Sequence, residues 1–357
     1  MTVNSVSSST ITSILQNTVS RLQSQMTTVE TENSTGQIAD IGLTLGDSSG
    51  HDIALHQQMA DLNALTSSNA IVTTQLDTAS NALTSLQQSA SSILSQTIGA
   101  LSDAPGSSGA VALQQTALGA LSSFTSLANA DVGGVHVFGG VNTGQAPLSA
   151  YSQTPASAAQ TAVQGAFQSY FGFSETSASV SSITGTQMTS FLNGPFAALF
   201  SSSNPTPNWT STWSSASSAT LTNRVSTSQT ISTSITANDP AFQSMAQGLT
   251  MLGEFGGLSL SSSAYSALVT SAQSTINTAN SQMIEASAAV GTMQNTVNDA
   301  DSAISLQQNV LTTQINNTES VNSYDVASQV SALTNQLQVA YSLTAQIQKL
   351  SLVTYIS

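Results

Sequence analysis

The strongest constraint on this chain is an apolar repeat between Leu62 and Ala100, which contains no proline and meets its first glycine at Gly99. Ten of twelve positions spaced alternately by three and four residues are apolar, as in a helix that packs along a neighbouring helix. At about 1.5 Å per residue such a helix is too long for a compact domain, so the repeat predicts a helical rod. The twelve positions are Leu62, Leu65, Asn69, Val72, Leu76, Ala79, Leu83, Leu86, Ala90, Ile93, Thr97 and Ala100.

Shorter repeats of the same spacing lie on both sides of this helix. They occupy residues 113–127, 290–315 and 326–347, and a weaker one occupies residues 11–29. Helical repeats therefore lie towards both ends of the chain, and a different segment separates them. This order predicts a hairpin in which helices lead out to a distal domain and helices lead back.

The middle segment, residues 145–238, has little helical periodicity and holds most of the aromatic residues. Residues 179–185 and 219–238 alternate apolar or β-branched residues with small polar ones, as half-buried strands do. We therefore expect a small β-rich domain whose aromatic residues form a core. Asp239 as N-cap and Pro240 at the first helical position predict that a helix starts directly after this segment.

Together these patterns predict a mainly α chain with a β-rich inserted domain and a long coiled-coil-like rod built from its N- and C-terminal segments. Three domains are expected. Residues 1–35 and 320–357 form a terminal helical assembly domain, residues 36–144 and 239–319 form the rod, and residues 145–238 form a variable outer domain.

The charge balance excludes several classes of partner. Seventeen acidic residues face only three basic ones, Arg21, Arg224 and Lys349, which gives a net charge of −14. Nucleic acids and anionic membrane surfaces bind clustered Lys and Arg, so neither is an expected partner.

A polar surface built from Ser, Thr, Asn and Gln suggests a protein outside the cell. Because the N-terminus lacks the basic region and apolar core of a signal peptide, we expect export without a cleaved signal peptide.

The sequence also contains patterns found in catalytic and metal sites, which we do not interpret as functional. Gly46–Gly50 spells the G-x-S-x-G motif of serine nucleophiles, but that motif requires a core strand before it. His51 and His56 lie about 140° apart around a helix, where they cannot share a metal ion. Asp299 and Asp301 lie on opposed helix faces and are expected to face solvent or a neighbouring subunit. No catalytic residue, cofactor or metal ion is expected.

A glycine-rich stretch, Gly133–Gly144, follows the 113–127 repeat. It lacks the lysine of a phosphate-binding loop. We expect Gly133 and Gly134 to end the preceding helix, and Gly139 and Gly140 to form a tight turn into the outer domain.

This stretch also carries a family resemblance. VHVFGGVNTGQAPL, following a long helix, resembles the element that ends the N-terminal conserved region of bacterial flagellins. Residues 34–65 resemble the segment that joins the first terminal helix to the rod in this family, in its alphaproteobacterial style. Residues 289–306 and 325–357 resemble the conserved C-terminal half. The last residues, LSLVTYIS, resemble the tail of the hook–filament junction branch of the family (hook-associated protein 3) more than the tail of filament flagellins.

The resemblance implies a structural role in the bacterial flagellum and no enzymatic activity. It implies a junction protein that joins hook to filament by helical self-assembly of its terminal helices, with a flagellin that forms the filament itself as the alternative. The implied partners are copies of the chain, a hook-side adaptor protein, flagellin, and an export chaperone on the C-terminal helix around residues 326–352. The implied location is the extracellular flagellum, reached through the type III export apparatus. A second alternative, from another class, is a secreted stalked adhesin or glycan-binding protein.

The apolar repeats at the two ends of the chain are the expected assembly interface. We expect them to be largely disordered in the monomer and to fold against each other and against neighbouring copies. Arg21 and Lys349 are expected to meet carboxylates on adjacent helices, such as those of Glu30, Glu32 or Asp325. The expected interface residues are Ile11, Leu15, Leu22, Met26, Val29, Val326, Val330, Leu333, Leu337, Ala340, Ile347 and Leu350.

Overall fold

The computed structural model describes the backbone of residues 8–356 and the side chains of residues 10–347. The chain divides into two compact units. The smaller unit comprises residues 1–63 and 305–357, and the larger unit comprises residues 64–304.

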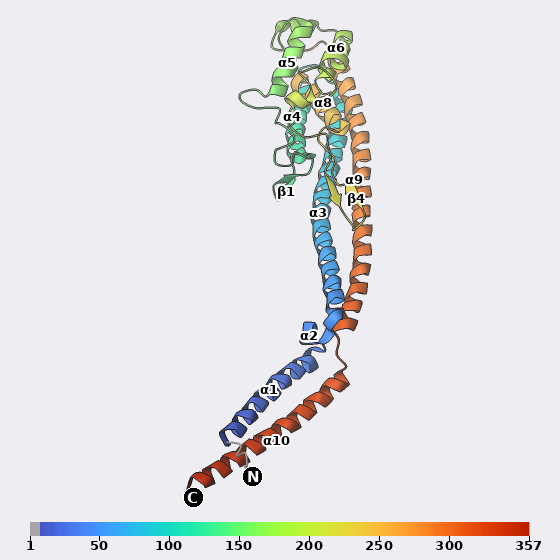
Figure 1. The fold of residues 1–357 in the computed structure, drawn as a ribbon. Coiled ribbons are helices and arrows are strands. Elements are labelled where there is room, and N and C mark those ends of the chain that lie inside the picture. The colour runs from blue at the N-terminus through green and yellow to red at the C-terminus, as the bar shows by residue number, and fades with distance from the viewer. Residues whose placement is uncertain (1–7, 357) are drawn as a thin grey trace. The chain divides into compact units, whose positions relative to one another are not determined.

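Two long helices, α3 and α9, contribute to both units (Figure 1). In the larger unit they run antiparallel, because Asn69 of α3 bonds to Asp301 of α9, and Gln87 of α3 bonds to Met283 of α9. Every position of the 62–100 repeat is buried except Leu65, which is half-buried. The predicted long, packed helix is therefore confirmed. The bounds are Ser49–Ala100 for α3 and Ser262–Glu319 for α9.

A polar residue within this repeat sets the register of the two helices. The Asn69 side chain is fully buried, and its Nδ2 donates to the Val225 carbonyl at 2.9 Å and to Asp301 Oδ1 at 2.6 Å. A buried polar residue in an apolar seam favours one register, because any other register leaves it without a partner. Asp301 therefore faces α3 and not solvent or a neighbouring subunit, which corrects the expectation made from its spacing to Asp299.

The helices α4 (Ser108–Ala128) and α8 (Pro240–Phe255) pack against each other in the same unit. The predicted start of α8 is confirmed, since the Asp239 carboxylate accepts a hydrogen bond from the Ala241 amide at 2.9 Å and Pro240 is the first helical residue. Proline suits this position because its missing N–H would have had no partner within the helix.

The middle segment contains more helix than strand, and the rest of it is turns and irregular backbone. This corrects the prediction of a β-rich domain. The residues expected as a strand at 179–185 form a 3-10 helix and the start of α6, whereas the expectation of strands at 219–238 is met by one short antiparallel hairpin. Ser and Thr side chains bond to nearby backbone amides and so end and begin short helices; Thr184 and Gln187 form such a capping box. The elements are α5 (Ala158–Phe171), η2 (Ala178–Ser182), α6 (Gly185–Phe191), η3 (Leu192–Phe196), α7 (Trp209–Thr212), β3 (Thr222–Arg224) and β4 (Thr230–Ser232).

The expected aromatic core is present, and it extends beyond the middle segment. The rings of Phe167, Phe191 and Phe196 lie 5.6–5.7 Å from the ring of Phe255 on α8. All four side chains are fully buried. The middle segment therefore shares one core with α8 instead of forming a core of its own.

The glycine-rich stretch forms two successive turns. Gly133 and Gly134, at φ 60° and 84°, are the central residues of a hairpin between β1 (Asp131–Val132) and β2 (Val135–His136). Positive φ at both positions is what a two-residue hairpin turn requires. Because α4 ends earlier, at Ala128, the expectation that these glycines end the helix is wrong.

The second turn contains Gly139 and Gly140, and the Asn142 amide donates to the Gly139 carbonyl across it at 3.2 Å. Gly140 has φ 61°, and a Cβ there would collide with the carbonyl oxygens of Ser217 and Ala219. The turn therefore needs glycine for its backbone conformation and for the close approach of the 217–219 segment.

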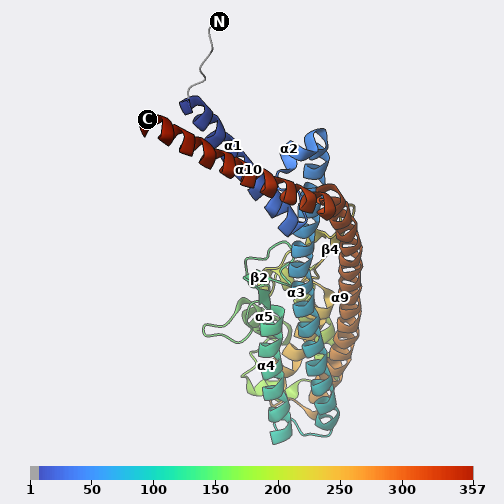
Figure 2. The same cartoon turned by 90° about the horizontal axis from the view of Figure 1, so that it is seen from below.

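The smaller unit pairs α1 with α10 (Figure 1, Figure 2). The segments that follow α1 and precede α10 are also paired, since the Ile38 amide donates to the Glu319 carbonyl at 2.8 Å and the Val321 amide donates to the Gly36 carbonyl at 3.0 Å. The elements are α1 (Ser8–Thr35), α2 (Ile41–Leu45), η1 (Gly46–Ser48), the start of α3, the end of α9, and α10 (Ser323–Ile356).

Gly140→Ala is expected to lower the free energy of unfolding by about 3 kcal/mol, because the change adds a strained backbone conformation and a steric clash. Gly165→Ala is the matched control. Gly165 lies on the exposed face of α5 with open space around it, so alanine there should stabilise by about 0.5–1 kcal/mol. Urea unfolding followed by circular dichroism measures both. Equal effects of the two substitutions would contradict the role of the Gly140 turn.

Candidate functional site

The helix pair α1–α10 brings together the apolar repeats from the two ends of the chain. Leu22 and Val29 of α1 and Val326 and Ala340 of α10 are buried. Ile11 is exposed, and the Leu350 side chain lies outside the described residues. The remaining predicted interface residues are half-buried: Leu15, Met26, Val330, Leu333, Leu337 and Ile347.

The pairing within one chain differs from the expectation of terminal segments that lack a partner in the monomer. Each apolar stripe covers the other, so both segments form helices in the structure. A hydrogen bond from Gln23 Nε2 to Tyr341 Oη, 2.8 Å long, also links the two helices. The cover is partial, because a pair of helices has only one contact face.

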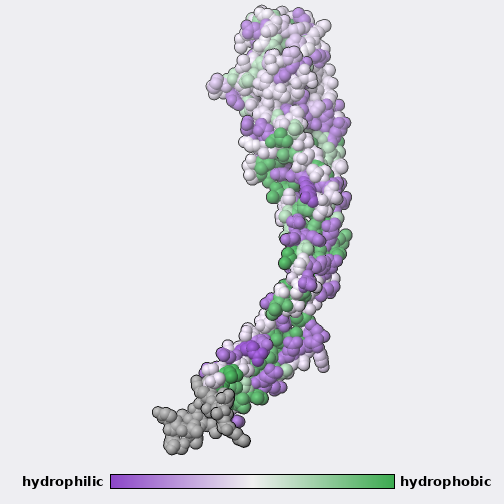
Figure 3. Space-filling model, viewed as in Figure 1, coloured by the Kyte–Doolittle hydropathy of each residue, from purple (hydrophilic) through white to green (hydrophobic). Residues whose placement is uncertain are grey.

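The outer surface of this pair keeps apolar side chains in contact with solvent, as the apolar patches on the visible face show (Figure 3). Val339 and Leu343 are 62% and 46% exposed and lie four residues apart, on one face of α10. Exposed apolar residues that are grouped on one face often mark an interaction surface. The periodicity of the sequence did not reveal these exposed residues, because the three- and four-residue spacing selects only the stripe that faces α1. Ile14 and Tyr341 are also more than half exposed.

The predicted ion pairs of Arg21 and Lys349 with carboxylates are not observed or excluded within a single chain. Arg21 is exposed and makes no ion pair in the described part of the chain, and the Lys349 side chain lies outside the described residues. Of the acids named as their partners, Glu32 accepts a hydrogen bond from the Ala39 amide at 3.1 Å. The pairing of Arg21 and Lys349 with carboxylates of adjacent helices stays a prediction about assembly.

The serine-nucleophile motif lacks the structural setting of a catalytic elbow. Residues Gly46–Ser48 form a 3-10 helix that follows the short helix α2, so no strand precedes Ser48. Ser48 and His51 are both exposed. His136 lies in β2, where its Nδ1 is 2.8 Å from the Asn129 carbonyl oxygen, so that histidine has a structural contact.

A carboxyl cluster in the larger unit was not found from the sequence. The Glu254 carboxylate accepts hydrogen bonds from Tyr151 Oη at 2.9 Å and from Gln164 Nε2 at 3.1 Å. Burial, together with the nearby Glu254 charge, raises the pKa of Glu175 to about 8. Burial also raises the pKa of Tyr151. The cluster joins α8, α5 and the loops beside them, and its residues lie too far apart in sequence for any motif to reveal it.

None of the helices in the described part of the chain combines the length and the apolar character that crossing a bilayer requires.

Two protein-family models match segments that contain most of the helical residues of the chain. The model of the bacterial flagellin N-terminal helical region matches residues 6–143, and the model of the bacterial flagellin C-terminal helical region matches residues 273–356. Together they span more than half of the chain. A solved structure of a flagellar hook-associated protein from Vibrio parahaemolyticus has a similar fold, with a TM-score of 0.52 and 13% sequence identity over 76% of this chain and 97% of that chain. No curated protein matches the sequence.

Glu175→Gln is expected to change how stability depends on pH. The pKa of Glu175 is about 8 in the folded chain, above the ordinary value of 4.5. The folded state thus holds a proton that the unfolded state has lost, and stability decreases as the pH rises from about 4.5 to about 8. The glutamine variant should lose this part of the decrease and be more stable than the wild type at pH 8.

Urea unfolding at pH 5, 6.5 and 8 measures this dependence. Glu285→Gln, which replaces an exposed carboxylate on α9, is the matched control and should follow the wild-type curve. A Glu175→Gln curve parallel to that of the wild type would rule out the raised pKa.

Proposed function

Because the chain belongs to the bacterial flagellin family, we propose that it is a structural protein of the flagellum that joins hook to filament. The family is one of structural proteins that self-assemble into the extracellular flagellum. The α1–α10 pair carries the proposal for this chain. It gathers both apolar end segments into one element and leaves apolar residues of α10 exposed to solvent.

Assembly in this proposal completes the burial that one chain achieves only in part. The residues of the pair that stay half-buried or exposed contact α1 or α10 of neighbouring copies. A fully exposed large apolar side chain that becomes buried contributes about 1.5–3 kcal/mol and a half-buried one correspondingly less, and the loss of freedom on association reduces both contributions. The low charge of the chain supports this role, because tightly packed helices leave little room for unpaired ions.

The junction role, as distinct from the filament role, rests on the last residues of the sequence. LSLVTYIS resembles the tail of junction proteins more than that of filament flagellins. The proposed partners are copies of the chain, a hook-side adaptor, flagellin, and an export chaperone that covers residues 326–352 before assembly. A flagellin that forms the filament itself is the alternative. In both roles the chain is extracellular and has no catalytic activity.

Replacing Val339 and Leu343 together by Asp is expected to abolish incorporation into flagella while leaving the chain folded, since both side chains are exposed in the monomer. The matched control replaces Gln338 and Ser342 by Asp. These residues have the same spacing and are also exposed, so the control adds the same charge and should still assemble. Motility and the amount of each variant in sheared flagella measure incorporation. Normal assembly of the Val339/Leu343 variant would show that this stripe is not an interface.

Fractionation of detached flagella tests the junction role against the filament role. We expect the chain as a trace component at the hook end, and hooks without filaments when it is deleted. Recovery of the chain as the bulk of the filament would establish the flagellin alternative instead.

A further inference from the structure

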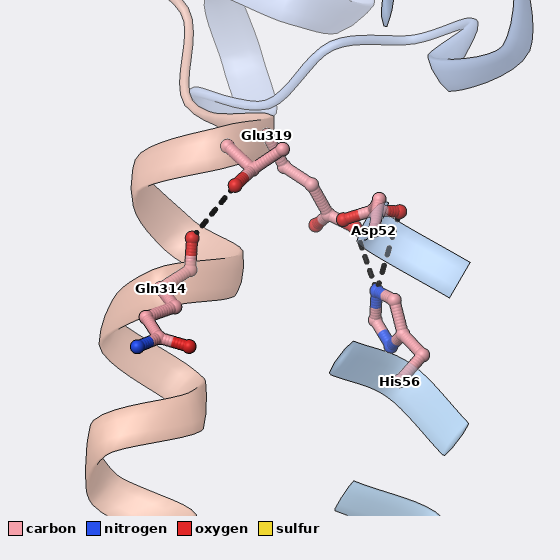
Figure 4. A network of polar contacts seen from close by, with 5 residues as sticks. Asp52, His56, Gln314 and Glu319 are labelled. Atoms are coloured by element: carbon pink, nitrogen blue, oxygen red, sulfur yellow. Dashed lines mark hydrogen bonds and ion pairs between the residues drawn. The ribbon is translucent and has the colours of Figure 1, made fainter. Parts of the chain in front are cut away.

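Three potential metal ligands meet in the smaller unit, where the first two turns of α3 face the last turn of α9 (Figure 4). His56 Nε2 lies 2.7 Å from Glu319 Oε1 and 3.9 Å from Asp52 Oδ2. One ligand atom from each of the three residues lies within 4.8 Å of the other two. Asp52 and His56 are four residues apart on one helix face, whereas Glu319 is the last residue of α9, 263 residues after His56.

Both carboxylates in this cluster are buried. Asp52 is 2% exposed and Glu319 is 7% exposed. Asp52 Oδ1 has no hydrogen-bond partner. A buried carboxylate oxygen without a partner is costly. The other oxygen of Asp52, Oδ2, is the one that faces His56, at 3.9 Å, so the carboxylate as a whole has room for a ligand that the protein chain alone does not supply.

The chain offers little positive charge to offset the two carboxylates. Among the described residues, the ion pairs are those of His56 itself. A protonated His56 would donate its Nε2–H to Glu319, would leave Asp52 Oδ1 unpaired, and would leave a net charge of −1 on the cluster. A divalent cation bound by both carboxylates and a neutral imidazole would bring that charge to zero and give the Asp52 carboxylate a strong partner.

The geometry points to a binding site for one divalent transition-metal ion of the zinc type, held by Asp52, His56 and Glu319. One imidazole nitrogen with two carboxylate oxygens is a donor set that Zn²⁺ accepts. Metal–ligand distances of about 2.0–2.2 Å place tetrahedral ligands about 3.3–3.6 Å apart, so small side-chain rotations would close the cluster around an ion. The His56 side chain is 52% exposed, which leaves room for water as a fourth ligand.

A bound ion would fasten the start of α3 to the end of α9. Backbone hydrogen bonds between residues 36–38 and 319–321 lie beside the cluster. The metal would therefore strengthen an existing contact between these segments. This inference is independent of the proposed role in the flagellum, because it concerns the isolated chain.

Titration of the full chain with ZnCl₂, followed by calorimetry and by thermal unfolding, tests the site. We expect one Zn²⁺ per chain and a rise in Tm, because an ion that binds the folded state alone stabilises it. His56→Gln, Asp52→Asn and Glu319→Gln should each weaken binding by about 100-fold or more. His51→Gln is the matched control, since His51 is an exposed histidine of the same helix, and it should bind as the wild type does.

A measurement on the wild-type chain identifies the metal-binding atom directly and does not depend on whether a variant folds correctly. Long-range ¹H–¹⁵N spectra of the wild-type chain should show the His56 Nε2 resonance shift on addition of Zn²⁺, while the His51 resonances do not. A variant that combines all three substitutions gives the background of non-specific binding. Three outcomes would overturn the proposal: no Zn²⁺ binding above this background, binding that His56→Gln leaves unchanged, or a His56 Nε2 that keeps its proton at saturating Zn²⁺. The last outcome would mean that the cluster is a hydrogen-bonded contact only.

Discussion

The structure depends on covering apolar stripes along helices that are too long to be covered by a compact core. In the larger unit, α3 and α9 cover each other, with α4, α8 and the middle segment completing one continuous core. In the smaller unit, α1 and α10 pack mainly against each other in the described part of the chain, and their apolar residues are correspondingly less buried. The difference is one of geometry, because a helix in a pair buries one face whereas a helix in a bundle buries several. The incompletely covered pair is therefore the part of the chain from which assembly is inferred.

Because the chain has few charged residues, amide side chains make many of its polar contacts between helices. Where many proteins use Lys or Arg, the contacts between α3 and α9 in the larger unit use amide side chains. Examples are Asn69 with Asp301, Gln294 with Asp77, and Gln87 with the backbone of Met283. Amides satisfy hydrogen bonds without the desolvation cost of a buried charge. Among the described residues the buried carboxylates are those of Asp52 and Glu319, while Glu175 and Glu254 are partly buried. Both clusters have unusual properties, in the raised pKa of Glu175 and in the unpaired oxygen of Asp52.

Local patterns in the sequence were sufficient to predict the long helices but not the secondary structure of the middle segment. The 62–100 repeat, the Asp239–Pro240 start of α8 and the aromatic core were all predictable, since each rests on neighbouring residues or on the helical period. Alternation of small polar and apolar residues was ambiguous, because Ser and Thr cap short helices as readily as they line strands. Gly133 and Gly134 were placed at a helix end for a similar reason: positive φ serves a C-cap and a hairpin turn alike.

The sequence by itself determined which faces of the helices are apolar, that both ends of the chain carry such faces, and that the chain offers almost no positive charge. Only the tertiary structure decided which face covers which, because a periodic stripe specifies that it must be buried but not what buries it. It also decided which distant residues meet, as Glu319 meets Asp52 and His56, and as Glu254 meets Tyr151 and Gln164. Contacts across hundreds of residues depend on the register between packed helices, and that register follows from the sum of many side-chain contacts, which no local pattern records.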